Sequence, residues 1–514
     1  MFSKVKSCAV HGVDGRMIDV EADVNDGLPV FTMVGYLSSS VRESSERVRT
    51  ALKNSGFHLP PKRITINLSP ADMRKDGSGY DLAIATAVLL SLGVTAELPM
   101  EQTLVLGELS LNGSIKAIPG VLPMVICARE EGMTSCIVPK ENVQEAALVQ
   151  GISVIGVSSL KETMEYIQGI KEYENTNVEQ PAVDTSEYLY DIDFSDVVGQ
   201  ESIKRGMEIA AAGFHNVLLT GAAGAGKSML AKRLPTILPQ MSFEESLEVT
   251  KIYSVGGMLP PEGGLIHRRP FRAPHHTISE YALIGGGRVP TPGEVSFAHY
   301  GVLFLDELPE FSKPVLEVLR QPLEDRRIRI SRVQASYEFP ADFMFVAAMN
   351  PCPCGNYPDY RRCSCTEQQI RRYQSKVSGP LLDRIDIRME VKGVKQEVLF
   401  SKQKTESSKT IRARVEQARQ MQKERFAGTG LLFNSQLDGK NLEEYITLSE
   451  EGKRLVLQLF EEQELSVRGV HRVLKLARTI ADLAGSEEIE NAHLQEAAFY
   501  RNQDVFAKGV LYGN

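Results

Sequence analysis

"VLLTGAAGAGKSMLAKRL", residues 217–234, is the stretch that decides how the second half of this chain folds. It opens on apolar residues that predict a strand and closes on a run that predicts a helix. Between them stands a phosphate-binding pattern: Gly221, four residues, then Gly226, Lys227 and Ser228. Glycine lets backbone N–H groups turn inward around phosphates, and the start of a helix adds a favourable dipole. The stretch therefore predicts a nucleotide site in an α/β domain.

The residues of this pattern have separate expected roles. Lys227 is suited to reach the β and γ phosphates of ATP, and Ser228 to bind Mg²⁺. We expect the nucleotide to contact a continuous run, namely Gly221, Ala222, Ala223, Gly224, Ala225, Gly226, Lys227, Ser228 and Met229. The alternative, an ordinary glycine-rich turn, is disfavoured by the flanking strand and helix. Pro235 predicts that the helix ends or kinks soon after Leu234.

A pair of carboxylates follows a second apolar run, in "GVLFLDELPEF". Val302 to Leu305 predict a buried parallel strand, and such a strand presents the residues after it at the sheet edge where a bound nucleotide lies. Asp306 is suited to hold Mg²⁺, and Glu307 to orient and polarise the attacking water. By itself the pair also fits a solvated turn, but the upstream phosphate pattern favours catalysis.

Three more polar residues are candidates for the same chemistry. The apolar run "FMFVAAMN" ends in Asn350, whose amide can hydrogen-bond the attacking water or the γ-phosphate, or cap the strand. Arg384 in "SGPLLDRIDI" and Arg468 near the start of a predicted helix are candidate cations. Ordinary surface ion pairs are the alternative for both arginines, with Asp383 or Asp386 as the partner of Arg384.

Four of the seven cysteines lie close together in "NPCPCGNYPDYRRCSC", residues 350–365. Cys352, Cys354, Cys363 and Cys365 form two Cys-x-Cys pairs that can supply four thiolates to a tetrahedral Zn²⁺. Reduced free thiols and an iron–sulfur or redox centre are the alternatives. The sequence leaves these three readings open.

Length and composition bound the architecture. A chain of 514 residues is too long for one hydrophobic core and suggests about three domains. Its 42% hydrophobic and 24% charged residues are typical of a globular protein, and we expect it in the cytoplasm, without membrane contact. The net charge of -8 argues against a protein that coats nucleic acid with its whole surface, so any such contact needs local basic patches.

The hydrophobic pattern divides the chain into four segments. Residues 1–168 alternate strand-like runs with helical ones, which predicts an α+β domain. Residues 169–192 are polar and acidic and are expected to form a linker. A second α/β pattern occupies residues 193–393, and residues 394–514 are charged and helical, as in a helical lid.

Taken in order, these motifs resemble those of AAA+ ATPases of the magnesium-chelatase-like group. The resemblance includes "DVVGQESIKRGMEIAAAG" before the phosphate pattern, "RRPFRAPHHTISEYALIGGG", "AAMNPCPCG" and "SGPLLDRIDI". The N-terminal segment, with "LPVFTMVGYLSSSVRESSERVRTALKNSGFHLPPKRITINL", is similar to the first domain of YifB/ComM proteins. The chain is therefore identified as a member of the YifB/ComM family along its whole length.

This resemblance implies a homo-oligomeric ring, a hexamer, that uses ATP and Mg²⁺. It assigns Lys227 and Ser228 to the Walker A motif, Asp306 and Glu307 to Walker B, and Asn350 to sensor 1. It makes Arg384 the finger that acts on the ATP of a neighbouring subunit, and Arg468 the sensor 2 arginine of the lid. The family is linked to DNA branch migration in natural transformation, which implies single-stranded or branched DNA as a partner.

The first domain also resembles the proteolytic domain of Lon, chiefly in "GELSLNGSIKAIPGVLPMVICAREEGMTSCIVPKENV". Where that family has a serine nucleophile and a lysine base, this chain has Gly79 and Leu122. Ser78 lies one position away, but a hydroxyl without a base is a poor nucleophile. We therefore expect a binding or assembly platform and not a protease. Its basic residues Lys62, Arg63, Arg74 and Lys75 fit either a surface for nucleic acid or a solvated face.

Two basic segments lie where ring motors usually contact their substrate. "HRRPFRAPHHT" carries Arg268, Arg269, Arg272, His275 and His276, and "EDRRIRISRVQASYEF" predicts a β-hairpin with Arg326, Arg327, Arg329 and Arg332. Pairing with acidic residues between subunits is the alternative. The leading hypothesis is an ATP-driven DNA translocase or branch-migration helicase. An ATP-driven remodelling motor for a protein partner is the second, and a nucleotide-gated scaffold the third.

Overall fold

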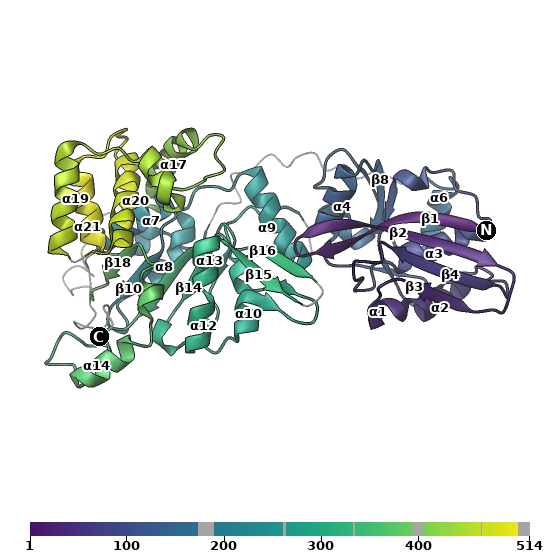
Figure 1. Cartoon of the computed structure of the whole chain (residues 1–514), viewed down its shortest axis with the longest axis horizontal. Coiled ribbons are helices and arrows are strands. Elements are labelled where there is room, and N and C mark those ends of the chain that lie inside the picture. The colour runs from purple at the N-terminus through teal and green to yellow at the C-terminus, as the bar shows by residue number, and fades with distance from the viewer. Residues whose placement is uncertain (173–189, 261–263, 333–334, 394–404, 464, 502–514) are drawn as a thin grey trace.

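The computed structural model describes residues 1–172, 190–260, 264–332, 335–393, 405–463 and 465–501. The molecule is elongated, with one large β-sheet in each half and a group of C-terminal helices at the end opposite the N-terminus (Figure 1). Most of the predicted linker at 169–192 lies outside the described residues, as do residues 394–404 and 502–514 of the predicted lid.

The N-terminal half is built on a seven-stranded sheet in the order β3-β4-β2-β1-β5-β8-β9. Its strands are β1 (Phe2–His11), β2 (Asp14–Asn25), β3 (Phe31–Val34), β4 (Arg63–Ser69), β5 (Thr103–Val105), β8 (Ser135–Pro139) and β9 (Ser153–Val157). β1 pairs antiparallel with β2, whereas β1, β5, β8 and β9 run parallel to one another. The mixed sheet confirms the predicted α+β class.

Helices pack on this sheet because their apolar residues need cover. They are α1 (Ser39–Arg42), α2 (Ser44–Asn54), α3 (Asp81–Ser91), α4 (Val121–Glu130), α5 (Val143–Ala146) and α6 (Leu160–Ile167), with a small hairpin of β6 (Glu108–Leu109) and β7 (Ile115–Lys116). Nearly every residue of α3 is buried, and its one charged residue, Asp81, accepts a hydrogen bond from Arg47 Nε at 2.8 Å. The pairing of a buried carboxylate keeps this apolar helix at the centre of the N-terminal core.

The second half is built on five parallel strands in the order β11-β14-β17-β10-β18. They are β10 (Val217–Thr220), β11 (Phe271–Arg272), β14 (Val302–Leu305), β17 (Met344–Met349) and β18 (Ile387–Glu390). Side chains along each strand alternate between two cores: Val217 and Leu219 pack on one face of the sheet, and Leu218 on the other. Burial on both faces explains why these strands are continuous apolar runs.

One face of this sheet is covered by α7 and the C-terminal helices, and the other by short helices of the middle segment. The first group is α7 (Glu201–Gly213), α17 (Ser408–Arg425), α18 (Gly439–Tyr445), α19 (Glu450–Glu462), α20 (Val467–Leu483) and α21 (Asn491–Arg501). The second group includes α10 (Glu280–Ile284), α11 (Glu294–Phe297), α12 (Lys313–Val318), α13 (Arg320–Asp325) and α15 (Gly379–Leu382). The helical character predicted for the C-terminal segment is confirmed for its described residues.

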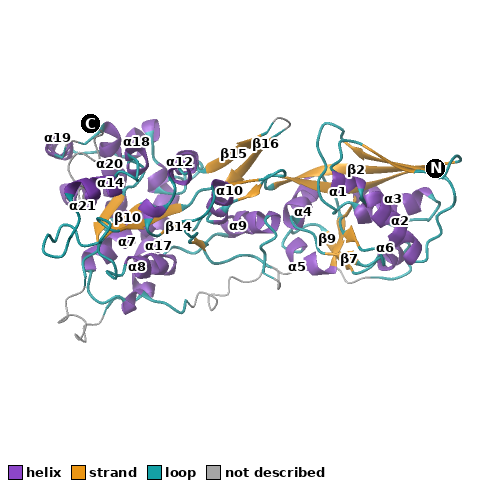
Figure 2. Cartoon of the chain, turned by 90° about the horizontal axis from the view of Figure 1, so that it is seen from below, coloured by secondary structure: helices purple, strands orange, loops and turns teal. Residues whose placement is uncertain are grey.

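The two halves touch through a defined surface. The hairpin of β15 (Arg327–Ser331) and β16 (Ser336–Pro340), together with α9 (Phe243–Val255), reaches the turn between β1 and β2 (Figure 2). The ring of His11 stacks on that of Tyr337 with centroids 4.5 Å apart. A small apolar cluster seals the contact, and it consists of Val13, Ile252, Phe297 and Phe339. The N-terminal half is therefore packed against the hairpin and not merely tethered to it.

Asp386 joins the C-terminal helices to the sheet. Its carboxylate accepts hydrogen bonds from the Asn216 backbone N–H at 3.1 Å and from Arg472 Nη1 on α20 at 3.2 Å. Burial alone would raise the pKa of Asp386, but His215 and Arg472 outweigh it and hold the pKa well below its usual range. The depressed pKa means that this carboxylate stabilises the fold above the unfolded-state pKa, and that the stabilisation is lost as the pH falls.

We expect Asp386→Asn to reduce the free energy of unfolding by about 3 kcal/mol at pH 7, because it leaves the buried Arg472 guanidinium without its counter-charge. The loss should shrink in acid, where Asp386 itself becomes protonated. Thermal and urea denaturation at pH 7 and in acid measure both effects. Asp383→Asn is the matched control, since that carboxylate is 48% exposed and lies 4.0 Å from Arg501. Equal destabilisation by the two changes would contradict the role given to Asp386.

Candidate active site

The phosphate loop joins the end of β10 to α8 (Lys227–Arg233). Gly224 and Gly226 have φ angles of 76° and 95°, in the left-handed region that side chains disfavour. A Cβ on Gly221 would lie 2.2 Å from the carbonyl oxygen of Val391, so only glycine fits there. After α8 the chain turns into a 3₁₀ segment, Leu234–Thr236, that contains Pro235. This confirms the predicted early end of the helix.

Lys227 lies at the centre of the loop and is only 8% exposed. Its Nζ donates hydrogen bonds to the carbonyl oxygens of Gly221 at 2.7 Å and Ala222 at 2.9 Å, and to Asn350 Oδ1 at 2.9 Å. Burial lowers the pKa of Lys227, while the carboxylates of Asp306 and Glu307 oppose the shift. The structure thus brings the predicted phosphate-binding lysine and the predicted sensor asparagine into direct contact.

The residues predicted to bind Mg²⁺ are also adjacent. Ser228 Oγ donates a hydrogen bond to Asp306 Oδ2 at 2.5 Å, and Asp306 Oδ1 accepts one from the Glu307 backbone N–H at 2.9 Å. A hydroxyl and a carboxylate beside a phosphate loop are the oxygen ligands that Mg²⁺ takes in nucleotide sites, so these residues fit the ion. Bound there, Mg²⁺ would neutralise charge on the β and γ phosphate oxygens.

Glu307 stands at the open side of this site. Its backbone is in the left-handed region, with φ of 53°, and its side chain is 59% exposed. Non-glycine residues in this conformation concentrate at functional sites, where strain is tolerated. Its carboxylate is therefore accessible to a water molecule that approaches the γ-phosphate position.

His276 is a neighbour of Glu307 that the sequence did not reveal. His276 Nδ1 lies 3.9 Å from Glu307 Oε2, although the sequence assigned this histidine to a DNA-contacting segment. The reason is the pairing of β11 with β14, which brings the residues after β11 beside those after β14. β11 has only two residues, too few to be recognised as a strand from the sequence.

Two further residues frame the loop. Gln200 Nε2 donates hydrogen bonds to the carbonyl oxygens of Ala225 and Lys392, each at 3.2 Å. This places the segment before α7 against the phosphate loop. Met229, in the first turn of α8, is 37% exposed and offers an apolar surface beside the loop.

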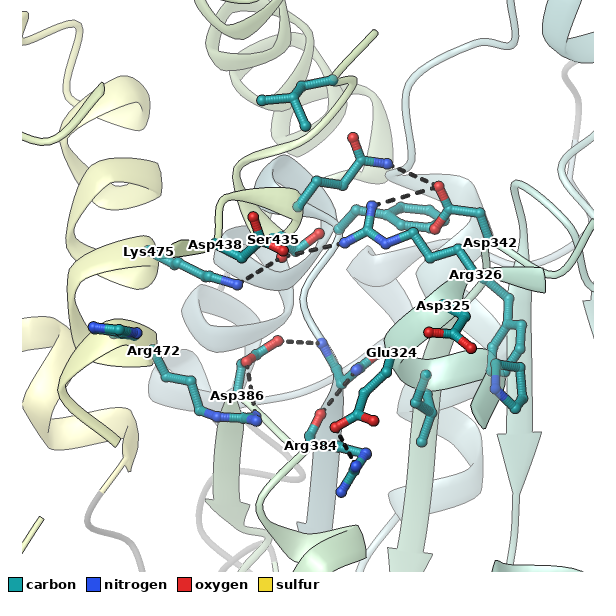
Figure 3. Close-up of a pocket in the computed structure, with 18 of the residues that line it drawn as sticks. Glu324, Asp325, Arg326, Asp342, Arg384, Asp386, Ser435, Asp438, Arg472 and Lys475 are labelled. Atoms are coloured by element: carbon teal, nitrogen blue, oxygen red, sulfur yellow. Dashed lines mark hydrogen bonds and ion pairs between the residues drawn. The ribbon is translucent and has the colours of Figure 1, made fainter. Parts of the chain in front are cut away.

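Arg384 and Arg468 lie at the edge of the sheet formed by the amino ends of the strands, whereas the phosphate loop lies at the carboxyl ends. The phosphate loop, Asp306 and Asn350 follow the carboxyl ends of their strands, whereas Arg384 precedes β18. The backbone carbonyl of Arg384 accepts a hydrogen bond from Asn216 Nδ2 at 2.9 Å, just before β10. Both arginines line a cavity of about 780 Å³ at this amino edge. Figure 3 shows Arg384 in this cavity, facing Glu324. The residues that line this cavity include none of the phosphate loop.

The guanidinium of Arg384 is held inside the cavity. It pairs with Glu324 and donates to the carbonyl oxygen of Pro380 at 2.5 Å, so its partner is neither Asp383 nor Asp386. Its Nε is buried and makes no hydrogen bond to the described residues. On the facing wall, α20 contributes Arg472 and Lys475, and burial lowers the pKa of Lys475 to about 8. The cavity therefore collects several cations around Arg384.

The four cysteines of the sequence cluster do converge. The Sγ atoms of Cys352, Cys354, Cys363 and Cys365 all lie within 4.8 Å of one another. Such a group could bind Zn²⁺.

Most of the basic residues predicted to contact DNA are engaged in internal pairs. Arg269 is buried and pairs with Glu245 at 3.0 Å, and Arg272 forms a two-pronged pair with Glu294 at 2.6 Å. The burial of Arg269 contradicts the DNA contact predicted for it, whereas DNA contact by the rest of this segment stays a prediction. Each of these two arginines is a buried or half-buried cation that needs a carboxylate partner.

The predicted hairpin is confirmed as β15 and β16, and its arginines are only partly neutralised. Arg327 and Arg329 share one carboxylate, Glu338, at 2.9 and 3.2 Å, and both are more than half exposed. Arg332 donates to the carbonyl oxygen of Gly287 at 3.0 Å. The hairpin therefore keeps an excess of positive charge on its surface.

The basic patch predicted for the N-terminal half is not a continuous surface. Lys75 is fully buried, and its Nζ donates to the carbonyl oxygens of Pro70 and, at 2.8 Å, Met73. Arg74 pairs with Asp76 at 3.2 Å. Lys75 is therefore a structural residue, because its ammonium group ties down the loop before α3.

The positions that would carry a protease dyad are filled by apolar packing. Leu122 is fully buried in the core beneath α4. A Cβ on Gly79 would lie 3.1 Å from Ile118 Cδ1, so there is little space for a nucleophile. The hydroxyl of Ser78 donates a hydrogen bond to Glu108, and in the described part of the chain it makes none to a lysine.

A parallel sheet in the order β11-β14-β17-β10-β18, with a phosphate loop that meets two carboxylates and an asparagine at one edge, defines a P-loop ATPase of the AAA+ class. The chain belongs to the YifB/ComM family of magnesium-chelatase-like ATPases. Residues 193–399 match the family described as "Magnesium chelatase, subunit ChlI". Residues 20–142 match "Subunit ChlI of Mg-chelatase", and residues 405–501 match "Magnesium chelatase, subunit ChlI C-terminal".

Full-length relatives support the same assignment. The chain is 40% identical to competence protein ComM of Haemophilus influenzae over 503 residues, which cover 97% of each protein. It is 41% identical to YifB of Escherichia coli over 506 residues, 98% of this chain and 97% of YifB. It is also 30% identical to Lon protease 2 of Bacillus subtilis over 183 residues, 32% of each protein. The predicted family and the partial similarity to Lon are confirmed.

None of the helices in the described part of the chain combines the length and apolarity that a membrane crossing requires.

Proposed function

We propose that this chain hydrolyses ATP at composite sites in a homo-oligomeric ring, a hexamer, with Mg²⁺ as the cofactor. The proposal rests on one observation: the residues that bind phosphate and Mg²⁺ lie at one edge of the sheet, and the candidate arginines lie at the opposite edge. Lys227, Ser228, Asp306, Glu307 and Asn350 stand at the carboxyl edge, and Arg384 and Arg468 at the amino edge. A head-to-tail contact between two subunits brings opposite edges together, and each site is then completed by its neighbour.

Within such a site each residue has a defined task. Lys227 binds the β and γ phosphates, Ser228 and Asp306 hold Mg²⁺, and Glu307 polarises the attacking water. Asn350, which already contacts Lys227, senses the γ-phosphate. Arg384 of one subunit stabilises the charge that develops on the γ-phosphoryl group bound by the next subunit. Arg468, which shares its cavity, supports the same phosphate from the lid.

The energy of hydrolysis is proposed to drive movement on single-stranded or branched DNA, in a branch-migration reaction of DNA recombination. Two facts support this. A relative with 40% identity over nearly its whole length is named a competence protein. The β15–β16 hairpin exposes Arg327 and Arg329 with one shared carboxylate between them, which leaves charge for phosphate contacts.

An ATP-driven remodelling motor for a protein partner is the second candidate. The matched families are described as a subunit of magnesium chelatase, so those relatives work beside other proteins. The N-terminal half would then be the docking platform, since Gly79 and Leu122 occupy its protease-like positions. We assign it no peptidase activity.

We further propose the domain boundaries 1–168, 193–393 and 394–514, with the linker at 169–192, and a location in the cytoplasm. The seven cysteines form no disulfide, as is usual in a reducing compartment.

ATP hydrolysis should be stimulated severalfold by forked DNA, and the stimulation should fall in a variant with Arg327→Ala and Arg329→Ala on strand β15 of the hairpin. The physical reason is the loss of two phosphate-binding cations, and a shallower salt dependence of DNA binding should accompany it. Hydrolysis, fork binding at several salt concentrations and branch migration measure these effects on the assembled protein.

Lys453→Ala with Arg454→Ala is the matched control, because these are also two exposed, neighbouring cations but lie on α19, outside the hairpin. Lys227→Ala removes hydrolysis altogether and reports any contaminating ATPase. An assembled protein that hydrolyses ATP but ignores every DNA would reject the DNA motor. If a co-purifying protein raised hydrolysis instead, the second candidate would be correct.

A further inference from the structure

The four-cysteine cluster is the feature that the ATPase chemistry does not use. It occupies the loop between β17 and α14 (Glu367–Gln374), and it begins two residues after Asn350. Three Sγ–Sγ distances are short: 3.4 Å for Cys352–Cys354, 3.7 Å for Cys352–Cys363 and 3.6 Å for Cys354–Cys363. Cys365 completes a group in which every Sγ is within 4.8 Å of the others.

These distances distinguish between the chemistries that four cysteines allow. A tetrahedral zinc–thiolate site with Zn–S bonds of about 2.3 Å has sulfurs about 3.8 Å apart, close to the separations observed. A disulfide needs sulfurs about 2.0 Å apart, and all seven cysteines are free. A cluster of several irons places its metal atoms and sulfides between the thiolates and spreads them beyond such a compact group. The geometry therefore fits one metal ion with four thiolate ligands.

Hydrogen bonds from neighbouring residues hold the cysteines in place, as is common around metal ligands. The Tyr357 backbone N–H donates to Cys352 Sγ at 3.4 Å. Asn356 Nδ2 donates to the carbonyl oxygens of Cys354 at 3.3 Å and Arg362 at 3.4 Å, and so links the two Cys-x-Cys arms. The bond to Sγ offsets the charge of a thiolate, and the bonds to the carbonyl oxygens hold the two arms in position. The site is built by the loop itself.

The loop also lies close to the phosphate loop. Gly355, between the arms, has φ of 81°, and a Cβ there would lie 3.5 Å from the Ala223 backbone nitrogen. On the other side, Gln374 Nε2 donates to the carbonyl oxygen of Pro351 at 2.8 Å. The segment is thus anchored between α14, Asn350 and the phosphate loop. A metal that closes it would fix one wall of the nucleotide site.

We propose that Cys352, Cys354, Cys363 and Cys365 bind one structural Zn²⁺, and that the closed loop braces the phosphate loop for nucleotide binding. The metal site stands on its own geometry, whereas the bracing role rests on the ATP site proposed above. Loss of zinc releases residues 352–365, so Gly355 no longer supports the backbone of Ala223, and nucleotide affinity falls.

The metal site is tested on the full chain purified without chelators. Elemental analysis should find about one zinc per chain, with no stoichiometric iron or acid-labile sulfide. Replacement of zinc by Co²⁺ should produce the visible absorption bands of a tetrahedral thiolate site, a readout that needs no cysteine variant. Absence of stoichiometric metal, or stoichiometric iron with sulfide, would overturn the zinc proposal.

The bracing role is tested with a pair of variants. Cys352→Ser with Cys363→Ser removes one ligand from each arm, and Cys127→Ser is the matched control outside the cluster. We expect the double variant to lose zinc and to bind a fluorescent ATP analogue about tenfold more weakly, a loss on the scale of removing support from a metal site. Because the double variant can misfold, a second measurement uses the parent protein. A mercurial bonds to the thiolates and displaces the zinc, and an excess of a small thiol then takes up the mercury so that added zinc can bind again.

The outcomes separate the two proposals. Zinc loss with unchanged nucleotide affinity overturns the brace and leaves the metal site. A parent protein that carries zinc but binds no ATP overturns the proposed ATPase function and leaves the zinc site intact.

Discussion

Replacing Arg384 with alanine should lower ATP turnover about 10³-fold, the smallest effect usual for an arginine finger, while ATP binding remains. The expectation follows from where the residue lies. Arg384 is at the amino edge of the sheet, so its removal leaves the phosphate loop, Asp306 and Asn350 of the same chain untouched. Steady-state hydrolysis gives turnover, and equilibrium binding of an ATP analogue gives affinity. Unchanged affinity also shows that the variant is folded.

A mixing experiment gives this prediction its sharpest form. Arg384→Ala and Lys227→Ala are each inactive alone, but in a mixed ring an Arg384→Ala subunit supplies a complete phosphate loop and a Lys227→Ala neighbour supplies the arginine. Random mixing in equal amounts should restore activity at about a quarter of the interfaces, because each intact site needs one particular order of subunits.

Arg320→Ala is the control for the mixing experiment, since Arg320 is a partly exposed arginine of the same domain that pairs only with Glu317 at 2.9 Å among its recorded contacts. Its removal should leave turnover within about twofold. If mixed rings stayed inactive, or if Arg384→Ala hydrolysed ATP normally, the trans arrangement would be wrong.

Changing Glu307 to glutamine is the second prediction with a large effect. It should reduce hydrolysis by about 10²-fold to 10⁴-fold, the usual contribution of a general base, and should leave ATP bound. The carboxylate is exposed at the end of β14 and touches no group that holds the phosphate loop in place. The variant should therefore accumulate as an ATP-bound assembly, visible as a stable high-mass species in light scattering when ATP is present.

Glu310→Gln is the matched control for that change. Glu310 is an exposed carboxylate three positions on, and its partner Lys376 lies 3.4 Å away at the surface. Its loss should leave hydrolysis unchanged. Equal losses of hydrolysis from the two changes would mean that the negative charge of residues 306–310 matters, and that Glu307 does not act as a base.

Where the sequence pattern was strong and local, it predicted the fold well. Val302–Leu305 is a strand with those bounds, and Pro235 ends α8 as expected. The long β1–β2 pair was not predicted, although Ile18, Val20, Ala22 and Val24 alternate inward with a period of two. Polar residues occupy the other face, so the strand contains no continuous apolar run, and only the period-two alternation marks it.

At the site, the sequence identified the groups but not all of their neighbours. Lys227, Ser228, Asp306 and Asn350 meet because parallel strands bring their carboxyl ends to one edge. The place of His276 beside Glu307 depends on a two-residue strand, and the buried roles of Lys75 and Arg269 depend on tertiary packing. A basic residue in a sequence carries a charge but no information on whether a carboxylate or a carbonyl will neutralise it.

The contact between the N-terminal half and the β15–β16 hairpin has a consequence for the assembly as a whole. Subunits joined by opposite edges all point the same way, so a closed assembly has two different faces. The stacking of His11 on Tyr337 fixes every N-terminal half beside its own hairpin. In the proposed ring, every copy of this half would therefore take the same position relative to its own hairpin, and the two faces of the ring would differ. A DNA strand that passed through such a ring would meet two unlike faces, which is the asymmetry that movement in one direction requires.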